Sequence, residues 1–416
     1  MVKKISKCRI CGNKELIPVV DLGEQYLTGI FPTSELMAKK ITKGPLRLVK
    51  CHSKNNCCGL LQLEHSYDLD EMYGDNYGYR SGLNKSMVEH LHNKVHKILD
   101  IVDLNPDDLV IDIGSNDGTT LSAYNKNLTL IGIDPTGNKF KEFYPDYIKL
   151  IPDFFTDTLV QSRYPDKKAK IVTSFSMFYD LESPQDFVNQ ISNILDPETG
   201  LWVFEQSYMP SMIEKNSYDT ICHEHLEYYG ISQVIWLLDK ANMKIIDVET
   251  NDINGGSFSI SAAHNSSIYS VNSDSINRLV RLEKDMNLSE IKPYLNFQLK
   301  IDESRDKLRR FFAKIKENGA NVSALGASTK GNVILQFCNI DEKLIPYIGE
   351  VNKYKFNKYT PGSNIKIISE ARLKKMRPDY LLVLPWHFKN FIIKKEKRFL
   401  SEGGKLIFPL PDIEIV

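Results

Sequence analysis

The stretch from Val110 to Gly118, V-I-D-I-G-S-N-D-G, constrains the fold of this chain more than any other. It begins as an apolar run that is typical of a buried parallel strand, and the run breaks at Gly114. A second apolar run, Leu128–Ile133, is closed by Asp134, and the residues between the two runs favour a helix. The order of strand, glycine turn, helix, strand and acid predicts a nucleoside-binding unit, in which the acid accepts hydrogen bonds from ribose hydroxyls.

The composition of the turn indicates which nucleoside is bound. A dinucleotide site needs G-x-G-x-x-G, so that a pyrophosphate can lie on the helix N-terminus. Here Asn116 replaces the middle glycine, which favours S-adenosylmethionine (SAM), a ligand without phosphates, over a nicotinamide cofactor. The expected cofactor contacts lie in this turn and at the ends of neighbouring strands: Asp112, Gly114, Ser115, Asn116, Asp117, Asp134, Pro135, Asp153, Phe154 and Ser176.

Length and charge narrow the class of protein. A chain of 416 residues should form two or three domains. Its 53 basic and 53 acidic residues balance, which argues against a nucleic-acid partner. No apolar run approaches the ~20 residues that span a bilayer, and no apolar segment follows the charged N-terminus as it would in a signal peptide. We therefore expect a cytoplasmic protein without a membrane partner.

Five of the seven cysteines lie before residue 60. The first pair has C-x-x-C spacing, and a second cluster about 40 residues later could complete a tetrahedral thiolate cage for structural zinc. The alternative is a set of free cysteines in a small domain. Cys58 is a better fourth ligand than Cys57 or His52, because a glycine follows it as Gly12 follows the first pair. The expected ligands are Cys8, Cys11, Cys51 and Cys58.

The chain after the cysteines reads as two α/β units. A tyrosine-rich loop, Tyr67–Arg80, precedes a parallel sheet that ends in an antiparallel hairpin, which fits the seven-stranded class I methyltransferase fold. Residues 268–317 predict one or two long helices, and a second α/β unit follows from Val322. The predicted fold class is therefore α/β, with a zinc-binding module at 1–75, a Rossmann-like methyltransferase domain at 76–265 and a second Rossmann-like domain at 266–416.

The motif C-H-E-H-L-E-Y-Y, Cys222–Tyr229, follows the fifth strand of the first unit. Two histidines and two acids resemble a metal site, but H-x-H lacks the H-E-x-x-H spacing that aligns two ligands on a helix. A polar loop without chemistry is a second interpretation. The third is a general base, in which a histidine is oriented by a neighbouring glutamate.

Two further motifs lie in the second α/β unit. G-A-S-T-K-G, Gly326–Gly331, follows a strand and opens a helix, but it lacks the Lys and hydroxyl that end a triphosphate loop. It predicts either a turn that holds a diphosphate or a plain tight turn. Y-L-L-V-L-P-W-H-F, Tyr380–Phe388, ends a strand in aromatic residues that could line a sugar or base pocket or pack in the core.

These motifs together resemble one known family. The order of the cysteine module, S-N-D-G-T, F-Y-D-L, W-V-F-E-Q-S-Y, N-S-Y-D-T-I-C-H-E-H-L-E-Y-Y, G-G-S, G-A-S-T-K-G-N and L-P-W-H-F is similar to that of the nucleotide-sugar C-methyltransferases of deoxysugar biosynthesis. The resemblance covers nearly the whole chain. It implies methylation of C3 in a 4-keto-6-deoxy sugar carried on a nucleoside diphosphate, with SAM as donor and zinc as a structural ion.

The resemblance also implies roles for individual residues. The family's general base falls on His225, with Glu224 beside it, and an active-site tyrosine falls on Tyr77 or Tyr79. The family has a tyrosine before H-E-H in some members, where this chain has Cys222. We expect a monomer or weak homo-oligomer; the rival activities are O- or N-methylation and nucleotide-sugar oxidoreduction. The expected substrate contacts are His223, Ser328, Lys330, Trp386 and His387.

Overall fold

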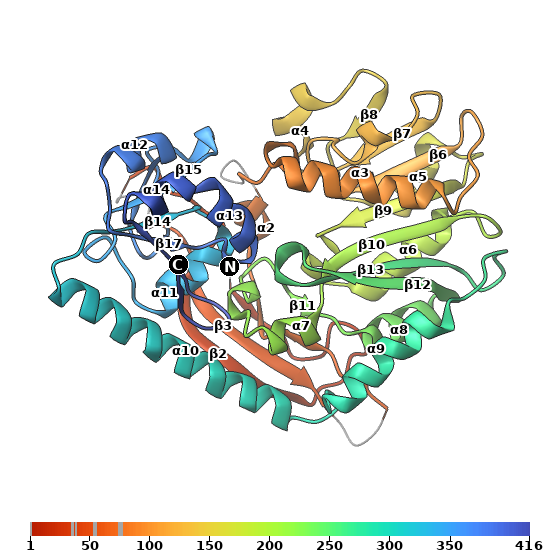
Figure 1. Ribbon diagram of the computed structural model, residues 1–416. Helices are drawn as coiled ribbons and strands as arrows, with labels where there is room; N and C mark the ends of the chain where they lie inside the picture. The colour runs from red at the N-terminus through yellow and green to blue at the C-terminus, as the bar shows by residue number, and fades with distance from the viewer. Residues whose placement is uncertain (1, 35–36, 38–39, 53–55, 74–77) are drawn as a thin grey trace.

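The computed structural model describes residues 2–34, 37, 40–52, 56–73 and 78–416. Figure 1 shows two lobes joined by the N-terminal strands, with the long helix α10 (Lys292–Glu317) along one side. The described residues form three large sheets and one small two-stranded sheet. Tyr77 lies outside the described residues.

The largest sheet has seven strands in the order β12-β13-β10-β9-β6-β7-β8. Its neighbours pair in parallel except at β10–β13 and β12–β13, which form the antiparallel edge. The predicted class I methyltransferase fold is therefore confirmed. The strand bounds are β6 Leu109–Ile113, β7 Thr129–Ile133, β8 Ile148–Ile151, β9 Ala169–Phe175, β10 Leu201–Ser207, β12 Met243–Asn251 and β13 Ser257–His264.

Helices cover both faces of this sheet because its central strands are apolar on both sides. The prediction of an α-helix between β6 and β7 was wrong, because the structure has only a 3-10 turn there, η2 (Leu121–Ala123). The polar turn before η2 and the sequence Asn125–Asn127 after it leave too few residues for an α-helix. The other helices are α3 Lys85–Leu99, α4 Gly137–Phe140, α5 Asp157–Arg163, α6 Pro184–Ile194, α7 Met209–Glu214, α8 Ile231–Lys240 and α9 Ser273–Asp285.

The second sheet, in the order β11-β4-β3-β2, joins two parts of the chain that are far apart in sequence. Three strands come from the cysteine module: β2 Leu16–Tyr26, β3 Lys43–Cys51 and β4 Leu61–Leu63. The fourth, β11 (Glu227–Tyr228), is the end of the C-H-E-H-L-E-Y-Y motif. A small sheet of β1 (Lys3–Lys4) and β5 (His65–Ser66) lies beside it, and the short helix α2 (Leu69–Tyr73) follows.

The C-terminal sheet has the order β16-β15-β14-β17-β18-β19, parallel except at β18–β19. One hydrophobic core runs from β2 and β3 through residues 209–228 into this sheet, so the cysteine module packs on the C-terminal lobe as well. The remaining bounds are β14 Val322–Leu325, α11 Thr329–Phe337, β15 Tyr347–Glu350, β16 Lys366–Ser369, α12 Glu370–Lys375, β17 Tyr380–Val383, α13 Lys389–Lys395, α14 Lys397–Ser401, β18 Lys405–Phe408 and β19 Glu414–Ile415.

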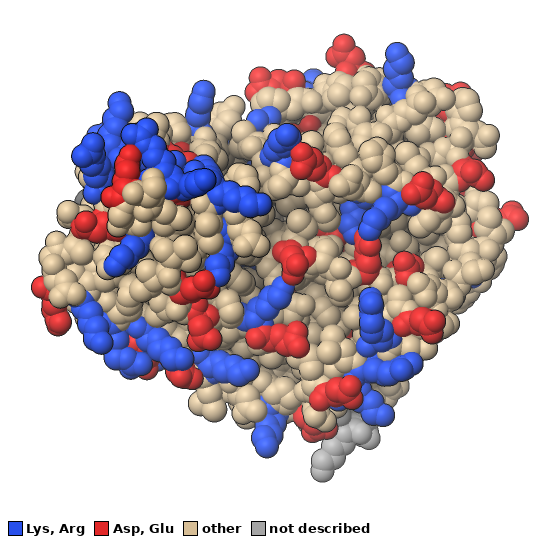
Figure 2. All heavy atoms as spheres, viewed as in Figure 1, with Lys and Arg blue, Asp and Glu red and all other residues tan. Residues whose placement is uncertain are grey.

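Charge is unevenly spread although the net charge is zero. Figure 2 shows Lys and Arg gathered over α12, α13 and α14, on the outer end of the C-terminal lobe. Acidic residues neutralise part of this face through the pairs Lys374–Glu396, Lys395–Glu370 and Arg398–Glu402. Within the described part of the chain, we found no helix with the length and apolar composition needed to cross a membrane.

Candidate active site

The glycine turn after β6 has the conformation that a close ligand approach requires. Gly114 has φ +73°, in the left-handed region where a side chain is strained. The next strand supplies Asp134, whose Oδ2 accepts from the backbone N of Asn116 at 2.8 Å and whose Oδ1 accepts from the backbone N of Thr136 at 2.7 Å. Oδ1 also accepts from Thr136 Oγ1 at 2.6 Å, so Oδ2 is the carboxylate oxygen with a lone pair left for a ribose hydroxyl.

Two further residues at this edge fit a nucleoside. Phe154, just beyond β8, is 52% exposed, and an adenine ring would cover such an exposed aromatic side chain. Asp112 is buried and accepts from Thr173 Oγ1 at 2.6 Å; burial raises its pKa to about 7. The residues of this edge therefore fit SAM, with an acid, a bare backbone turn and an apolar surface in the expected places.

Other predicted cofactor residues have structural partners. Asn116 Oδ1 accepts from the backbone N of Ser81, and its Nδ2 donates to the carbonyl of Tyr79 at 3.2 Å. Asp117 Oδ2 accepts from the backbone N of Gly82 at 2.9 Å. These two side chains therefore fasten the end of the tyrosine-rich segment over the glycine turn. Tyr79 is half exposed at this position.

His225 has the geometry of a general base. Its Nδ1 lies 2.8 Å from the carbonyl oxygen of Thr220, which can only accept, so Nδ1 carries the proton and Nε2 has a free lone pair. Burial and then the nearby Lys330 ammonium lower the pKa of His225 to about 3. The Tyr179 ring packs on the imidazole with centroids 4.2 Å apart. The imidazole is thus neutral, fixed in one tautomer and held on one face.

Glu224 does not orient His225, contrary to the predicted pairing. Its carboxylate instead faces the cysteine module, where its Oε2 accepts from Thr28 Oγ1 at 3.3 Å and its side chain packs against Gly29. Burial raises the pKa of Glu224. This carboxyl group therefore lies at the contact between the cysteine module and the methyltransferase domain.

His223 is fully buried and does not line an open site, so its predicted substrate contact is not supported. Its Nδ1 lies 3.4 Å from Thr28 Oγ1, and its ring meets the edge of Tyr67 with centroids 4.6 Å apart. Burial lowers its pKa to about 3. His223 therefore packs against Thr28 and Tyr67 of the cysteine module and fixes the C-H-E-H-L-E-Y-Y motif to it.

The C-terminal lobe contributes Lys330 to the surroundings of His225. Its Nζ donates to Asn254 O at 2.7 Å and to Thr220 Oγ1 at 3.3 Å. Lys330 and His225 therefore both contact Thr220, an arrangement that the resemblance of G-A-S-T-K-G to a phosphate loop did not predict. Ser328 Oγ accepts from the backbone N of Gly331 and caps α11, so this hydroxyl is already used by its own helix.

Trp386 and His387 also lie in this region. Trp386 Nε1 donates to Asp219 Oδ2 at 2.8 Å, and the ring lies against Gly255. Burial, followed by the charges of Lys330 and Lys215, lowers the pKa of His387 to about 3. The structure thus gathers the H-E-H, G-A-S-T-K-G and L-P-W-H-F motifs at one contact between the two lobes.

Sequence reasoning missed several residues of this cluster. Thr220 and Asp219 lie in N-S-Y-D-T-I, and Tyr179 and Asp180 lie in F-Y-D-L; both motifs carried the resemblance, but their side chains had no assigned role. Asp180 accepts from Tyr73 OH at 2.9 Å, so Tyr73 of the tyrosine-rich segment also reaches this cluster. The proximity of these motifs to H-E-H in sequence was the available signal.

The four predicted zinc ligands come together. The Sγ atoms of Cys8, Cys11, Cys51 and Cys58 all lie within 4.8 Å of one another, whereas Cys57 is not in this group. Gly12 and Gly59, which follow the two knuckles, have φ of +71° and +68°. The donor set is all thiolate with no open position, which fits a structural zinc ion that takes no part in the chemistry.

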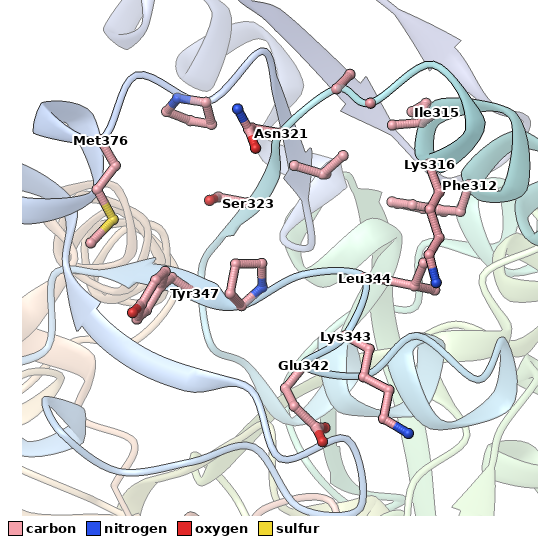
Figure 3. A pocket seen from close by; sticks show the side chains of 15 residues that line it. Phe312, Ile315, Lys316, Asn321, Ser323, Glu342, Lys343, Leu344, Tyr347 and Met376 are labelled. Atoms are coloured by element: carbon pink, nitrogen blue, oxygen red, sulfur yellow. The ribbon is translucent and has the colours of Figure 1, made fainter.

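A separate cavity of about 530 Å³ lies in the C-terminal lobe (Figure 3). Its lining includes Asn321, Ser323, Tyr347 and Met376, which lie at the amino ends of β14 and β15 and just before β17. The G-A-S-T-K-G turn lies at the opposite, carboxyl end of β14. The cavity is therefore not part of the cluster around His225.

Comparison with known proteins places this arrangement in a family. Three family models match in order: a zinc binding domain at residues 8–73, a methyltransferase domain at 84–248 and a C-methyltransferase C-terminal domain at 252–411. The C-methyltransferase NovU of Streptomyces niveus is 28% identical over 420 residues, covering 100% of this chain and 98% of that protein. This chain belongs to the C-methyltransferase family. It is an enzyme that uses SAM, and its thiolate cage is the family's zinc-binding site.

Two solved methyltransferases match part of this C-methyltransferase. A SAM-dependent methyltransferase from Clostridium acetobutylicum is 11% identical, with a TM-score of 0.32, and the match covers 42% of this chain and 92% of that one. The magnesium protoporphyrin IX methyltransferase of Synechocystis, solved with bound SAH, is 12% identical, with a TM-score of 0.32, and the match covers 43% and 82% of the two chains.

Proposed function

We propose that this C-methyltransferase adds a methyl group to C3 of a 4-keto deoxysugar carried on a nucleoside diphosphate. The observation that carries the proposal is the tautomer of His225, whose Nδ1–H is held by Thr220 O so that Nε2 can take a proton. A carbon acid beside a ketone needs such a base, and the resemblance to the nucleotide-sugar enzymes supports a sugar as the carrier of that ketone.

In this proposal, His225 Nε2 removes the proton on C3 and the electrons of the C–H bond delocalise onto the 4-oxygen as an enolate. Charge on the imidazolium is then shared with the Thr220 carbonyl through Nδ1–H. The Lys330 ammonium, fixed by Asn254 O and Thr220 Oγ1, is the cation near this base and stabilises the enolate oxygen electrostatically. His225 finally loses the proton to water.

SAM held at the Gly114 turn would supply its sulfonium methyl group to the enolate carbon: the S–CH3 bond breaks as the new C–C bond forms, and S-adenosylhomocysteine leaves. Asp134 and the Gly114 backbone would hold its nucleoside, and Phe154 would cover its base. Burial raises the pKa of Glu224, and in this proposal its carboxyl group, which accepts from Thr28, would donate to a substrate oxygen when protonated. The chain's own part is thus to position the ketone, accept one proton and exclude water.

The second Rossmann-like unit supports a nucleotide as the handle of the substrate. Its glycine turn, Gly326, has φ +80°, and β15 ends in Glu350, which repeats the order of strand, glycine turn, helix, strand and acid seen around Gly114. Lys355 lies at the same edge and donates to Ala327 O at 2.7 Å. We therefore place the nucleoside diphosphate along this edge and the sugar toward Trp386 and His387.

The test is proton exchange in deuterated water with a nucleotide 4-keto sugar. The wild-type enzyme should give a C3-methylated product by mass spectrometry and should exchange the C3 proton with a non-transferring SAM analogue bound. His225→Gln should lower both turnover and exchange by about 10²–10⁴-fold and leave SAM affinity within twofold (~0.4 kcal/mol). Methylation without any need for the ketone would instead indicate an O- or N-methyltransferase.

A further inference from the structure

The zinc module forms a sheet with the segment that follows His225. The carbonyl of Leu226 accepts from the backbone N of Leu63 at 2.8 Å, and β11 pairs with β4 in the register Glu227–Gln62. The backbone N of Leu226 donates to the carbonyl of Tyr179, whose ring packs on His225. The residues that directly follow the proposed base are therefore fixed by the sheet of the zinc module.

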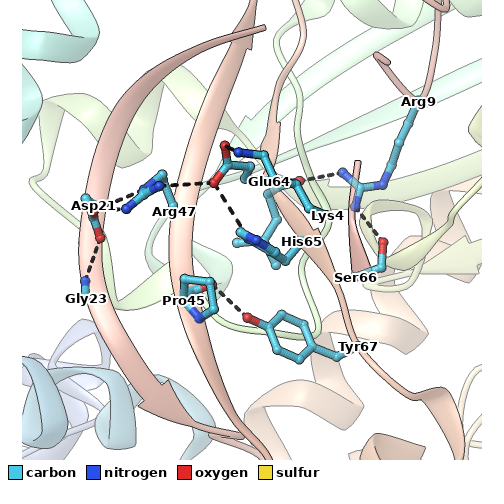
Figure 4. Close-up of polar contacts among 11 residues, drawn as sticks. Lys4, Arg9, Asp21, Gly23, Pro45, Arg47, Glu64, His65, Ser66 and Tyr67 are labelled. Carbon is cyan, nitrogen blue, oxygen red and sulfur yellow. Dashed lines mark hydrogen bonds and ion pairs between the residues drawn. The ribbon is translucent and has the colours of Figure 1, made fainter. Parts of the chain in front are cut away.

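Arg9, between the zinc ligands Cys8 and Cys11, connects the thiolate cage to this sheet. Its side chain is only 3% exposed. NH1 donates to Leu63 O at 2.7 Å and NH2 to Ser66 Oγ at 2.9 Å; Figure 4 shows the guanidinium reaching Ser66. Its Nε also lies 3.4 Å from the half-exposed Glu182. A side chain with this many fixed partners is rigid because its fork is fully engaged.

The same guanidinium faces Glu227, two residues after His225. The Glu227 side chain is completely buried, and its Oε1 lies 3.6 Å from Arg9 Nε. Among the described residues neither carboxylate oxygen of Glu227 has a hydrogen-bond partner. Burial raises the pKa of Glu227 well above its usual value; the Arg9 guanidinium opposes this shift, and the charges of Glu182 and Asp180 add to it. Loss of Arg9 would leave this buried acidic side chain without the guanidinium that faces it.

The second knuckle is also tied to this segment, from the other side. Gln233 on α8 donates through Nε2 to the carbonyl of the zinc ligand Cys58 at 2.9 Å, and its Oε1 accepts from the backbone N of Gly230. The segment from His225 to Gln233 is thus held to one knuckle by Arg9 and to the other by Gln233. Closure of the cage fixes both attachments relative to each other.

We propose that Arg9 is a positioning residue for His225, acting through its buried pair with Glu227, so that the zinc cage sets the geometry of the proposed base. The inference rests on the proposed function only in naming His225 as the base. The mechanical part, that Arg9 orders residues 221–229, does not depend on the substrate and can be tested without one.

The test compares zinc-loaded Arg9→Met, Arg9→Lys and the double variant Arg9→Met/Glu227→Gln. Lys4→Met is the matched control, because it breaks the Lys4–Glu64 ion pair of the same module, 2.8 Å long, without facing Glu227. Zinc content, SAM affinity, hydrogen–deuterium exchange of residues 221–229 and turnover are measured for each. If the shape and charge of Arg9 matter, Arg9→Lys should recover part of the function and Arg9→Met none.

We expect Arg9→Met to keep its zinc and its SAM affinity, to lose protection at residues 221–229 but not at 109–134, and to lower kcat by about tenfold or more with little change in the KM for SAM. The double variant should recover protection, because no buried acidic side chain remains without its partner. Unchanged protection of residues 221–229 in Arg9→Met, or additive effects in the double variant, would overturn the proposal. Lost protection with no activity on keto sugars in any variant would count against the proposed function alone.

Discussion

Gly29→Ala should displace Glu224 without unfolding the protein. An alanine Cβ at this position would overlap Glu224 Oε1 and lie 3.3 Å from Glu224 Cδ, with Thr329 Oγ1 next at 3.6 Å. The φ of Gly29 is outside the left-handed region, so alanine strains no backbone there. The overlapping atom is the end of a flexible side chain, and the carboxylate can therefore retreat by about 1 Å to a normal contact distance.

Gly29→Ala should change kcat much more than it changes the free energy of unfolding. Loss of the Thr28–Glu224 hydrogen bond costs about 1 kcal/mol, and the lower entropy of an unfolded alanine returns about 0.4–1 kcal/mol. Unfolding free energy should therefore change by less than about 1 kcal/mol. A displacement of about 1 Å in an active site can cost about 10²-fold in rate, and we expect kcat to fall by that factor.

The assay is methyl transfer from SAM to a nucleotide 4-keto sugar, followed by mass spectrometry, with SAM affinity and thermal unfolding measured in parallel. Gly23→Ala is the control: Gly23 lies in the same module with φ +74° and open space around it, so alanine should cost roughly 1–2 kcal/mol of stability but keep kcat. If Gly29→Ala retains turnover within about threefold, the placement of Glu224 in the site is refuted.

Three other changes test the electrostatics and the metal. Lys330→Met should move the acidic limb of kcat/KM up by about one pH unit (roughly 1.4 kcal/mol), because the Lys330 ammonium lowers the pKa of His225 and its removal favours the imidazolium; an unmoved limb in a folded variant would contradict this. Asp112→Asn should stabilise the fold more at pH 8 than at pH 5: a buried carboxyl with its pKa raised to about 7 stabilises when protonated and loses that contribution as the pH rises through 7. A larger gain in Tm at pH 5 would show the reverse. Cys11→Ser should abolish zinc binding, measured by metal analysis, and lower Tm; a zinc-free variant with unchanged Tm would argue against a structural ion.

Local sequence predicted most of the fold. Apolar strands with a glycine turn and a terminal acid gave the seven-stranded sheet, and Gly12 and Gly59 identified Cys58 as the cysteine that joins the cage. The prediction of a helix between β6 and β7 was wrong, because the few apolar residues that favoured it are flanked by polar residues that do not continue the helical pattern. The spacing of apolar residues identifies individual strands and helices, and the correct predictions were of that kind.

The contacts between distant segments could not be predicted in this way. Lys330 has the sequence context of a phosphate turn, yet its amine reaches Thr220 in the other lobe. Glu224 sits beside His225 in sequence, yet its partner is Thr28, 196 residues away. No local pattern carries such information, because it arises only when β2, the H-E-H segment and α11 pack together.

The shared sheet also limits how this chain can be divided. A fragment that starts at residue 84 would contain all seven strands of the SAM sheet but would leave β11 without its sheet partner β4 and would open the apolar surface that β2 and β3 cover. We expect such a fragment to self-associate. Expressing the domains separately, or exchanging the zinc module alone, would therefore remove strands that cover the apolar surface of the neighbouring lobe. Recombination among relatives should keep the zinc module and the methyltransferase domain together.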